Sequence, residues 1–273
     1  MNKTLYTPKL SFGKWCFLFI GGIILFTIAY AFASIPELYI GNNWISGTLS
    51  FICGVLLLLM YRWLVRSYEE RKIEELSMQK CLKHTGIGLL WGMLMMAAVI
   101  GIFALCGWYK IIGCSFNVAF VYRYLMAYFV VAVGEEIVFR GIMFRLFDSQ
   151  FNLWVALIFS SFLFGAAHII NPNATVVSTV GISLASGVLF GLLFKYYRTL
   201  WVPIGIHWSW NFVQGTVAGC PVSGGAPDYS ILESFTSGPE LFTGGLFGPE
   251  ASVITMAIGF VMCVWIGIKL FKR

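Results

Sequence analysis

Long apolar stretches are the feature that most constrains this chain of 273 residues. An α-helix rises about 1.5 Å per residue and the hydrocarbon core of a bilayer is about 30 Å thick, so roughly 20 apolar residues complete one crossing. Eight stretches approach that length: Trp15–Ala33, Trp44–Val65, Ile87–Trp108, Tyr124–Phe147, Leu153–Ile170, Ser178–Phe194, Leu200–Ala218 and Ala251–Leu270. Hydrophobic residues make up 59% of the chain and charged residues only 11%, which excludes an ordinary water-soluble domain. The predicted fold is all-α, a polytopic membrane helix bundle with about eight transmembrane helices.

The positions of Lys and Arg predict the orientation of this bundle, because cytoplasmic loops hold an excess of these residues. The basic residues expected inside are Lys3, Lys9, Lys14, those of the stretch Arg62–Lys83, Arg145, Lys195, Arg198, Lys269, Lys272 and Arg273. The opposite loops contain Lys110 and Arg123. An even number of crossings with both termini cytoplasmic satisfies this pattern. The net charge of +6 is spread over short clusters, which does not indicate a nucleic-acid partner.

Two loops and the cysteines complete the organisation. The stretch Ser67–Lys83 mixes Glu with Lys and Arg, partly at a spacing of four, which predicts a solvated cytoplasmic helix. The loop Gly219–Glu250 is rich in Gly and Pro and fits either a flexible outer connector or a lid. The seven cysteines occur singly, so neither a disulfide framework nor a thiolate zinc site is predicted.

Two acidic residues, Glu135 and Glu136, lie near the middle of an apolar stretch. An ionisable group at that depth costs at least a few kcal/mol, so it needs a partner or a function. Glu136 precedes Arg140 by four residues and lies on the same helix face, which predicts an ion pair. Glu135 points elsewhere and is left free to act as a general base. The other ten acidic residues are expected at aqueous boundaries.

Further polar residues occur in two other apolar stretches. His168 follows Phe164 by one helical turn, and His207 precedes Asn211 by one turn. Taken alone, each histidine also fits a core residue bonded to a carbonyl. Together with the Glu pair, these residues from three separate helices indicate a common buried site that handles water or a substrate.

This pattern resembles the CAAX-protease and bacteriocin-processing family of intramembrane endopeptidases, also called the Abi family, which includes the type II CAAX prenyl endopeptidases. Its motifs E-E-x-x-x-R, F-x-x-x-H and H-x-x-x-N match Glu135, Glu136 and Arg140, then Phe164 and His168, then His207 and Asn211. The resemblance covers roughly residues 126–253, and the stretch 243–252 looks like the bacterial branch. It implies two parts, N-terminal transmembrane helices with a cytoplasmic loop over 1–110 and a catalytic membrane core over 118–273.

The resemblance implies hydrolysis of a peptide bond within the membrane. Glu135 would activate water with His168 beside it, and His207 and Asn211 would donate hydrogen bonds to the developing oxyanion. Glu136, Arg140 and Phe164 would have structural and tuning roles. The expected substrate is a hydrophobic or lipidated peptide or protein, reached from the lipid bilayer or the cytoplasm.

Members of this family have been described both as metalloproteases and as glutamate-dependent enzymes. We favour a metal-free mechanism with no cofactor, because Asn is a poor zinc ligand and no H-E-x-x-H motif is present. In the zinc alternative, Glu135, His168 and His207 would be the ligands.

The expected depth of His168 conflicts with either mechanism. A helix that starts near Leu153 places His168 about 10 Å beyond Glu135 along the membrane normal, unless that helix begins later or the preceding one is displaced.

The leading functional prediction is an intramembrane endopeptidase in a bacterial cytoplasmic membrane, acting in peptide maturation or bacteriocin immunity. One alternative is a transporter that conducts protons or cations through the same Glu and His network. The other is a non-catalytic immunity or binding protein. The sequence leaves the oligomeric state open.

Overall fold

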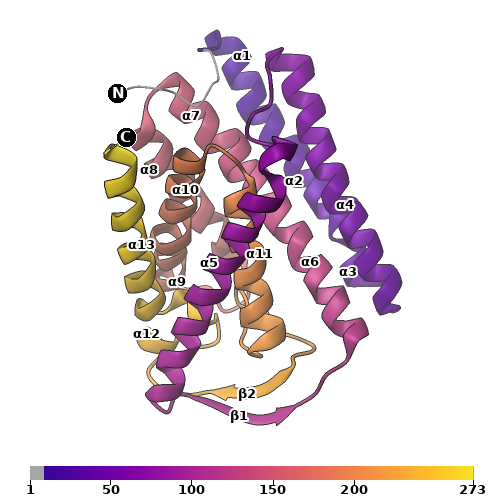
Figure 1. Cartoon of the computed structure of the whole chain (residues 1–273), viewed down its shortest axis with the longest axis vertical. Coiled ribbons are helices and arrows are strands. Elements are labelled where there is room, and N and C mark those ends of the chain that lie inside the picture. The colour runs from indigo at the N-terminus through magenta and orange to yellow at the C-terminus, as the bar shows by residue number, and fades with distance from the viewer. Residues whose placement is uncertain (1–8, 273) are drawn as a thin grey trace.

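Helices packed side by side make up nearly all of the structure, a computed structural model that describes residues 9–272 (Figure 1). Helical residues account for 75% of the chain, as the all-α prediction requires.

Several helical segments follow one another end to end, and each such series forms one rod. The first rods are α1 (Phe12–Cys16), η1 (Phe17–Gly21), α2 (Gly22–Ala33) and α3 (Ile35–Tyr39); α4 (Asn43–Leu64) with η2 (Val65–Glu69); and α5 (Met78–Leu105). The rods of the second part are α6 (Val118–Glu136), η3 (Ile137–Phe144) and α7 (Arg145–Gln150); α8 (Leu153–Ala167) with η4 (His168–Ile170); α9 (Val176–Ile182), η5 (Ser183–Val188) and α10 (Leu189–Tyr197); α11 (Trp201–Phe212) with η6 (Val213–Val217); and α13 (Val253–Phe271).

Six of these rods are long and apolar enough to cross a membrane: 12–39, 43–69, 78–105, 153–170, 176–197 and 253–271. The two remaining rods of the predicted eight differ for identifiable reasons. The rod from α6 to α7 contains Glu135, Glu136 and Arg140 in its apolar middle, and the rod of α11 and η6 is shorter than 18 residues. Both lie within the bundle, where α6 packs on α4 and α11 packs on α5. Neighbouring helices, not lipid, therefore surround the polar residues that these two rods carry.

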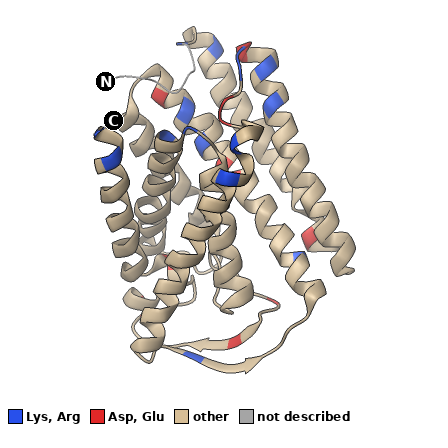
Figure 2. Cartoon of the chain, in the orientation of Figure 1, with Lys and Arg blue, Asp and Glu red and all other residues tan. Residues whose placement is uncertain are grey.

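The two termini lie at the same end of the bundle, and the two strands lie at the opposite end (Figure 1). Most Lys and Arg residues lie towards the end with the termini (Figure 2). This distribution agrees with the predicted orientation, in which the termini are cytoplasmic. We refer to the end with the termini as the terminal end and to the end with the strands as the strand end.

The position of the turn between α7 and α8 removes the predicted difference in depth between His168 and Glu135. The helix begins at Leu153 as predicted, but the preceding rod continues to Gln150, past the expected end at Phe147. Glu135 lies 15 residues before Gln150 and His168 lies 15 residues after Leu153, so both are about 22 Å from the intervening turn. The fourth rod is thus displaced, and the two side chains reach the same level.

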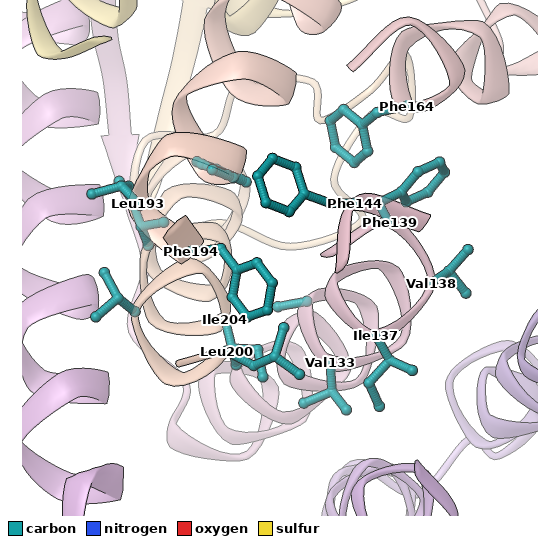
Figure 3. Packing of buried hydrophobic residues seen from close by; sticks show 14 of the residues in the cluster. Val133, Ile137, Val138, Phe139, Phe144, Phe164, Leu193, Phe194, Leu200 and Ile204 are labelled. Atoms are coloured by element: carbon teal, nitrogen blue, oxygen red, sulfur yellow. The ribbon is translucent and has the colours of Figure 1, made fainter. Parts of the chain in front are cut away.

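The apolar core joins η3, α10 and α11 through residues such as Ile137, Phe144, Phe194 and Ile204 (Figure 3). Behind α11, glycines permit close contact with α5. A Cβ atom at Gly92 would lie 2.4 Å from the Ile206 carbonyl oxygen, which no ordinary side chain permits. This approach fixes the depth and rotation of α11, the helix that carries two of the predicted site residues.

The prediction of a solvated helix over Ser67–Lys83 is wrong. Residues 70–77 form a non-helical loop, and two carboxylates of the stretch, Glu69 at the end of η2 and Glu75 in the loop, are buried. Arg145 donates to both Glu69 oxygens at 2.6 and 2.7 Å, and Arg71 binds both Glu69 and Glu75. Tyr61 donates to Glu75 at 2.8 Å. These ion pairs offset the free-energy cost of burying the carboxylates. The charge pattern alone did not show them.

The outer loop over 219–250 is a packed structure. Strand β2 (Leu232–Thr236) pairs antiparallel with β1 (Tyr109–Cys114), and α12 (Glu240–Thr243) and η7 (Pro249–Ala251) follow. Phe247 and Thr243 are each 2% exposed. The two-stranded sheet was not predicted, because neither strand shows a clean alternation of apolar and polar residues.

The loop network makes stability depend on pH. Burial acts to raise the pKa of Glu75, but the hydrogen bonds and charge of Arg71 outweigh it and lower that pKa to about 2. A lowered pKa stabilises the fold above the unfolded value of 4.5, and the contribution is lost as the pH falls from there towards 2. We expect Glu75→Gln to lower the free energy of unfolding at pH 7 by roughly 3 kcal/mol. The difference from wild type should shrink between pH 4.5 and 2, as measured by thermal unfolding in detergent.

Glu74→Gln is the matched control, because Glu74 is the neighbouring carboxylate and lies outside the ion-pair network. It should leave the melting temperature unchanged at either pH. A Glu75→Gln protein as stable as Glu74→Gln at pH 7 would contradict the assignment.

Candidate active site

Two adjacent carboxylates at the end of α6 have different surroundings. Glu136 is completely buried, and its Oε1 accepts a hydrogen bond from Arg140 Nη1 at 2.9 Å, so the predicted ion pair is present. Glu135 Oε2 has no hydrogen-bond partner within residues 9–272, and the Glu135 side chain lines a cavity. Successive helix positions differ by about 100° in direction, which lets one carboxylate be paired while its neighbour is free.

Arg140 ties this pair to two other helical rods. Its Nη2 donates to the carbonyl oxygens of Ser186 and Gly187 at 3.1 and 3.2 Å. The guanidinium carbon lies 4.4 Å from the ring centre of Phe164 and 5.1 Å from that of Phe190. Cation–π contacts of this kind stabilise a desolvated guanidinium. Phe164 of the F-x-x-x-H motif is therefore a packing partner of Arg140.

His168 stands at the end of α8 with its two ring nitrogens in different environments. Nδ1 lies 2.7 Å from the Phe164 carbonyl oxygen, which can only accept, so Nδ1 carries the hydrogen. Nε2 lies 3.9 Å from Glu135 Oε2. The carbonyl bond expected of a core histidine is present, yet it orients the other nitrogen towards Glu135.

His207 on α11 contacts both carboxylates. Nδ1 lies 3.0 Å from Glu136 Oε1, and Nε2 lies 3.9 Å from Glu135 Oε2. An ionised Glu136 only accepts, so Nδ1 of His207 also carries its hydrogen. Asn211, one turn further along α11, lines the same cavity as Glu135. The six polar or charged motif residues thus meet in one place, from three rods.

The cavity in front of Glu135 has a volume of about 680 Å³, within the range typical of ligand sites. Its wall includes His168, His207 and Asn211. Most of the remaining wall is apolar or aromatic, with Tyr30, Tyr124, Tyr128, Val131, Val138 and Phe139 among the lining residues. The space accommodates an extended apolar peptide segment next to an unpaired carboxylate.

A second, small cavity of about 20 Å³ lies on the other side of His168, His207 and Asn211, and this volume holds one water molecule. Glu250 and Ser223 also line it. Glu250 Oε1 accepts from both the amide and the hydroxyl of Ser223, the latter at 2.8 Å. The prediction that Glu250 lies at an aqueous boundary is wrong, since it is 5% exposed.

The Ser223 turn that Glu250 holds has an unfavourable backbone. Ser223 has φ of 48°, in the left-handed region, and a Cβ atom at Gly224 would lie 1.7 Å from the Pro172 carbonyl oxygen. Sequence reasoning missed this contact between the outer loop and the site. The one available signal was a carboxylate immediately before the apolar stretch Ala251–Leu270, and no spacing rule connects that position with residue 223.

Glu135 Oε2 faces the Nε2 atoms of His168 and His207 across a gap. The separation of these atoms suits a bridging water better than a zinc ion. At 3.9 Å each pair is too far apart for a direct hydrogen bond, and one water can contact both atoms. Ligands of tetrahedral zinc, with bonds of about 2.0–2.1 Å, lie about 3.3 Å apart. Within the described part of the chain, no group of three or more His, Cys, Asp or Glu side chains has the geometry to hold a metal ion.

Comparison with known proteins agrees with this geometry. Residues 117–213 match the family described as "Type II CAAX prenyl endopeptidase Rce1-like". Over this stretch the chain is similar to the type II CAAX prenyl endopeptidases. Six of its helices are long and apolar enough to cross a membrane, as in an integral multi-pass membrane protein. The match runs from the start of α6 into η6 and includes all seven motif residues, but it ends before the stretch 243–252. No curated protein matches the chain.

The two neighbouring carboxylates should differ in their effect on stability. Glu136→Gln leaves the buried Arg140 without its counter-charge, and we expect it to reduce the free energy of unfolding by about 3 kcal/mol. Glu135→Gln removes a carboxylate oxygen that has no partner, so its melting temperature should stay within a few degrees of wild type. Thermal unfolding of both variants in detergent tests this. Equal destabilisation by the two substitutions would contradict the difference in pairing.

Glu250 should hold the Ser223 turn through acceptance of hydrogen bonds, not through its charge. Burial raises the pKa of the Glu250 carboxyl, so its ionised form is disfavoured in the fold, and stability is lost as the pH rises above the unfolded value of 4.5. Glu250→Gln keeps an acceptor and should be at least as stable as wild type at pH 8. Glu250→Ala leaves two donors of Ser223 unpaired, and it should lose about 1–3 kcal/mol and expose the loop to limited proteolysis. A Glu250→Ala protein as protease-resistant as Glu250→Gln would disprove this role.

Proposed function

We propose that this chain is a glutamate-dependent intramembrane endopeptidase that hydrolyses a peptide bond in a hydrophobic or lipidated peptide. One observation carries the proposal. Glu135 Oε2 is unpaired, lies 3.9 Å from each of two histidine Nε2 atoms, and its side chain lines a cavity of about 680 Å³. A free carboxylate beside a space for a peptide is what water activation requires.

In the proposed first step, a water molecule between Glu135 and His168 attacks the scissile carbonyl carbon. A bond forms between the water oxygen and that carbon, the carbonyl π electrons move to oxygen, and Glu135 takes the proton. The Nε2 atom of neutral His168 accepts the second hydrogen bond of the water and orients it. Collapse of the tetrahedral intermediate breaks the C–N bond, and the proton passes from Glu135 to the leaving amine.

In the same proposal His207 and Asn211 stabilise the oxyanion. Asn211 donates through its side-chain amide. His207 can donate from Nε2 only when its ring is protonated, because Nδ1 already faces Glu136. The Glu136 carboxylate balances the resulting charge. Each donor of an oxyanion hole contributes about 3 kcal/mol to the transition state.

Glu136, Arg140 and Phe164 act as positioning residues in this mechanism. Glu136 orients His207, Arg140 pairs with Glu136, and Phe164 supports both the guanidinium and His168. None of the three lines the large cavity. Their replacement should therefore alter catalysis through the orientation of His168 and His207.

The cavity and the membrane-spanning helices support a substrate that is itself apolar. We propose peptide maturation or bacteriocin immunity in a bacterial cytoplasmic membrane as the setting, with zinc or another cofactor not required. Glu135 and His207 line the cavity, whereas the neighbouring Glu136 and Arg140 are buried and do not line it. A charge pair buried away from the cavity suits a hydrolytic chamber better than the ion path of a transporter.

Comparative peptidomics of membranes that carry wild type or Glu135→Gln tests the proposal. Glu135→Gln should abolish release of specific peptides, with a loss of about 10³-fold, and Asn211→Ala should reduce it by about 10²–10³-fold. Glu240→Gln, which changes an exposed carboxylate in α12, is the control and should leave cleavage unchanged. Ion flux in liposomes that Glu135→Gln abolishes, without any peptide cleavage, would support the transporter instead. Full biological function of Glu135→Gln would support the non-catalytic binding protein.

Chelator treatment separates the two chemical mechanisms. In the metal-free mechanism the purified enzyme keeps its full rate after chelation, with metal analysis confirming that zinc is gone. A reversible loss of activity that zinc restores would show that Glu135, His168 and His207 close by about half an ångström around an ion.

A further inference from the structure

The large cavity reaches the surface in the half of the molecule that ends in the strands. Gly225, Ala226 and Asp228, from the connection between η6 and β2, are exposed and line it. On the side wall, Thr27 of α2 is also exposed, and Ile170 of η4 is 87% exposed. The opening therefore faces the strand end and the adjacent lipid, and it is remote from the terminal end (Figure 1).

The charges of the two ends differ strongly. Within residues 9–272, Lys110 and Arg123 are the basic residues of the strand end, whereas the others gather towards the terminal end or lie buried in the rods (Figure 2). Arg123 is neutralised, since it binds Glu37 at 3.2 Å and the Ile40 carbonyl oxygen at 3.1 Å. The excess of Lys and Arg on the cytoplasmic side of membrane proteins assigns the terminal end to the cytoplasm. The strand end, and with it the opening, is then extracytoplasmic.

The rim of the opening has an acidic character. No Lys or Arg is among the described residues that line the cavity, whereas Asp228 at the rim is an exposed carboxylate that accepts a hydrogen bond from the Tyr124 hydroxyl at 3.3 Å. The rings of Tyr124 and Tyr128 line the wall inside this rim. A carboxylate next to aromatic faces attracts a cationic side chain. A free C-terminal carboxylate, by contrast, finds no Lys or Arg on this wall.

We propose that the cavity receives its peptide from the extracytoplasmic side and holds a Lys or Arg side chain of that peptide at Asp228, with apolar residues of the peptide next to Glu135. The inference rests on the proposed peptidase function and adds the side of entry and the class of substrate. It implies cleavage at an internal bond of an apolar segment that has a basic flank on the outer surface of the membrane.

Sidedness can be tested on the natural protein without any assay of activity. Cys106 and Cys114 are the exposed cysteines among the seven, and both lie at the strand end, at the end of α5 and of β1. A membrane-impermeant maleimide added to intact cells should label the wild-type protein, and the variant with Cys106→Ser and Cys114→Ser should lose that label. Labelling that appears only after the membrane is permeabilised would overturn the proposal.

The rim is tested with purified enzyme in detergent and two otherwise identical apolar peptides, one with Lys and one with Glu in the flank. The Lys peptide should be cleaved with a higher kcat/KM, and Asp228→Asn should lower that value about fivefold through KM while leaving cleavage of the Glu peptide unchanged or improved. Glu233→Gln, an exposed carboxylate of β2 outside the cavity wall, should change neither value. Equal effects of Asp228→Asn on both peptides would refute the rim assignment.

The two experiments separate this proposal from the peptidase function. Extracellular labelling without cleavage of any peptide would refute the peptidase while leaving the outward orientation in place. Cleavage in detergent together with labelling from the cytoplasmic side would refute the outward opening while leaving the peptidase in place.

Discussion

The buried ion pair of Glu136 and Arg140 is the interaction on which the site depends. Arg140 is 1% exposed and Glu136 is fully buried, so each would be strongly unfavourable without the other. Through Arg140 the pair holds η5 and the rings of Phe164 and Phe190, and through Glu136 it holds His207 of α11. One charge pair thus links the rods that contribute the polar side chains, and its loss would disturb all of them together.

The pairing of Glu136 is also what leaves Glu135 available. Two adjacent carboxylates on a helix cannot share one counter-ion on one face, so the one that Arg140 does not reach is directed into the cavity. Its two histidine neighbours are oriented from behind, by the Phe164 carbonyl and by Glu136, so that both Nε2 atoms face the same carboxylate oxygen. Groups with fixed orientation need little rearrangement when charge develops, which is the main source of catalytic stabilisation in such sites.

Different parts of the molecule were predictable to different degrees. The Glu136–Arg140 pair followed from a spacing of four, because a helix brings such residues to one face whatever surrounds it. Glu69 and Glu75 were misjudged as solvated, because their burial depends on contacts between η2, the loop after it and Arg145 of α7. The contact of Glu250 with Ser223 was likewise invisible, since it joins residues 27 positions apart in a segment without helical periodicity.

Apolar length and the spacing of a few polar residues determined, from the sequence alone, that this is a helical membrane protein and which residues of α6, α8 and α11 are candidates for its site. Both are local properties, set by the rise and rotation of a helix. Tertiary structure decided the rest: the level at which His168 meets Glu135, the close packing of α11 on α5, and the position of the loop that bounds the cavity. These depend on where each rod ends and how closely it approaches its neighbour, and contacts between distant segments set both.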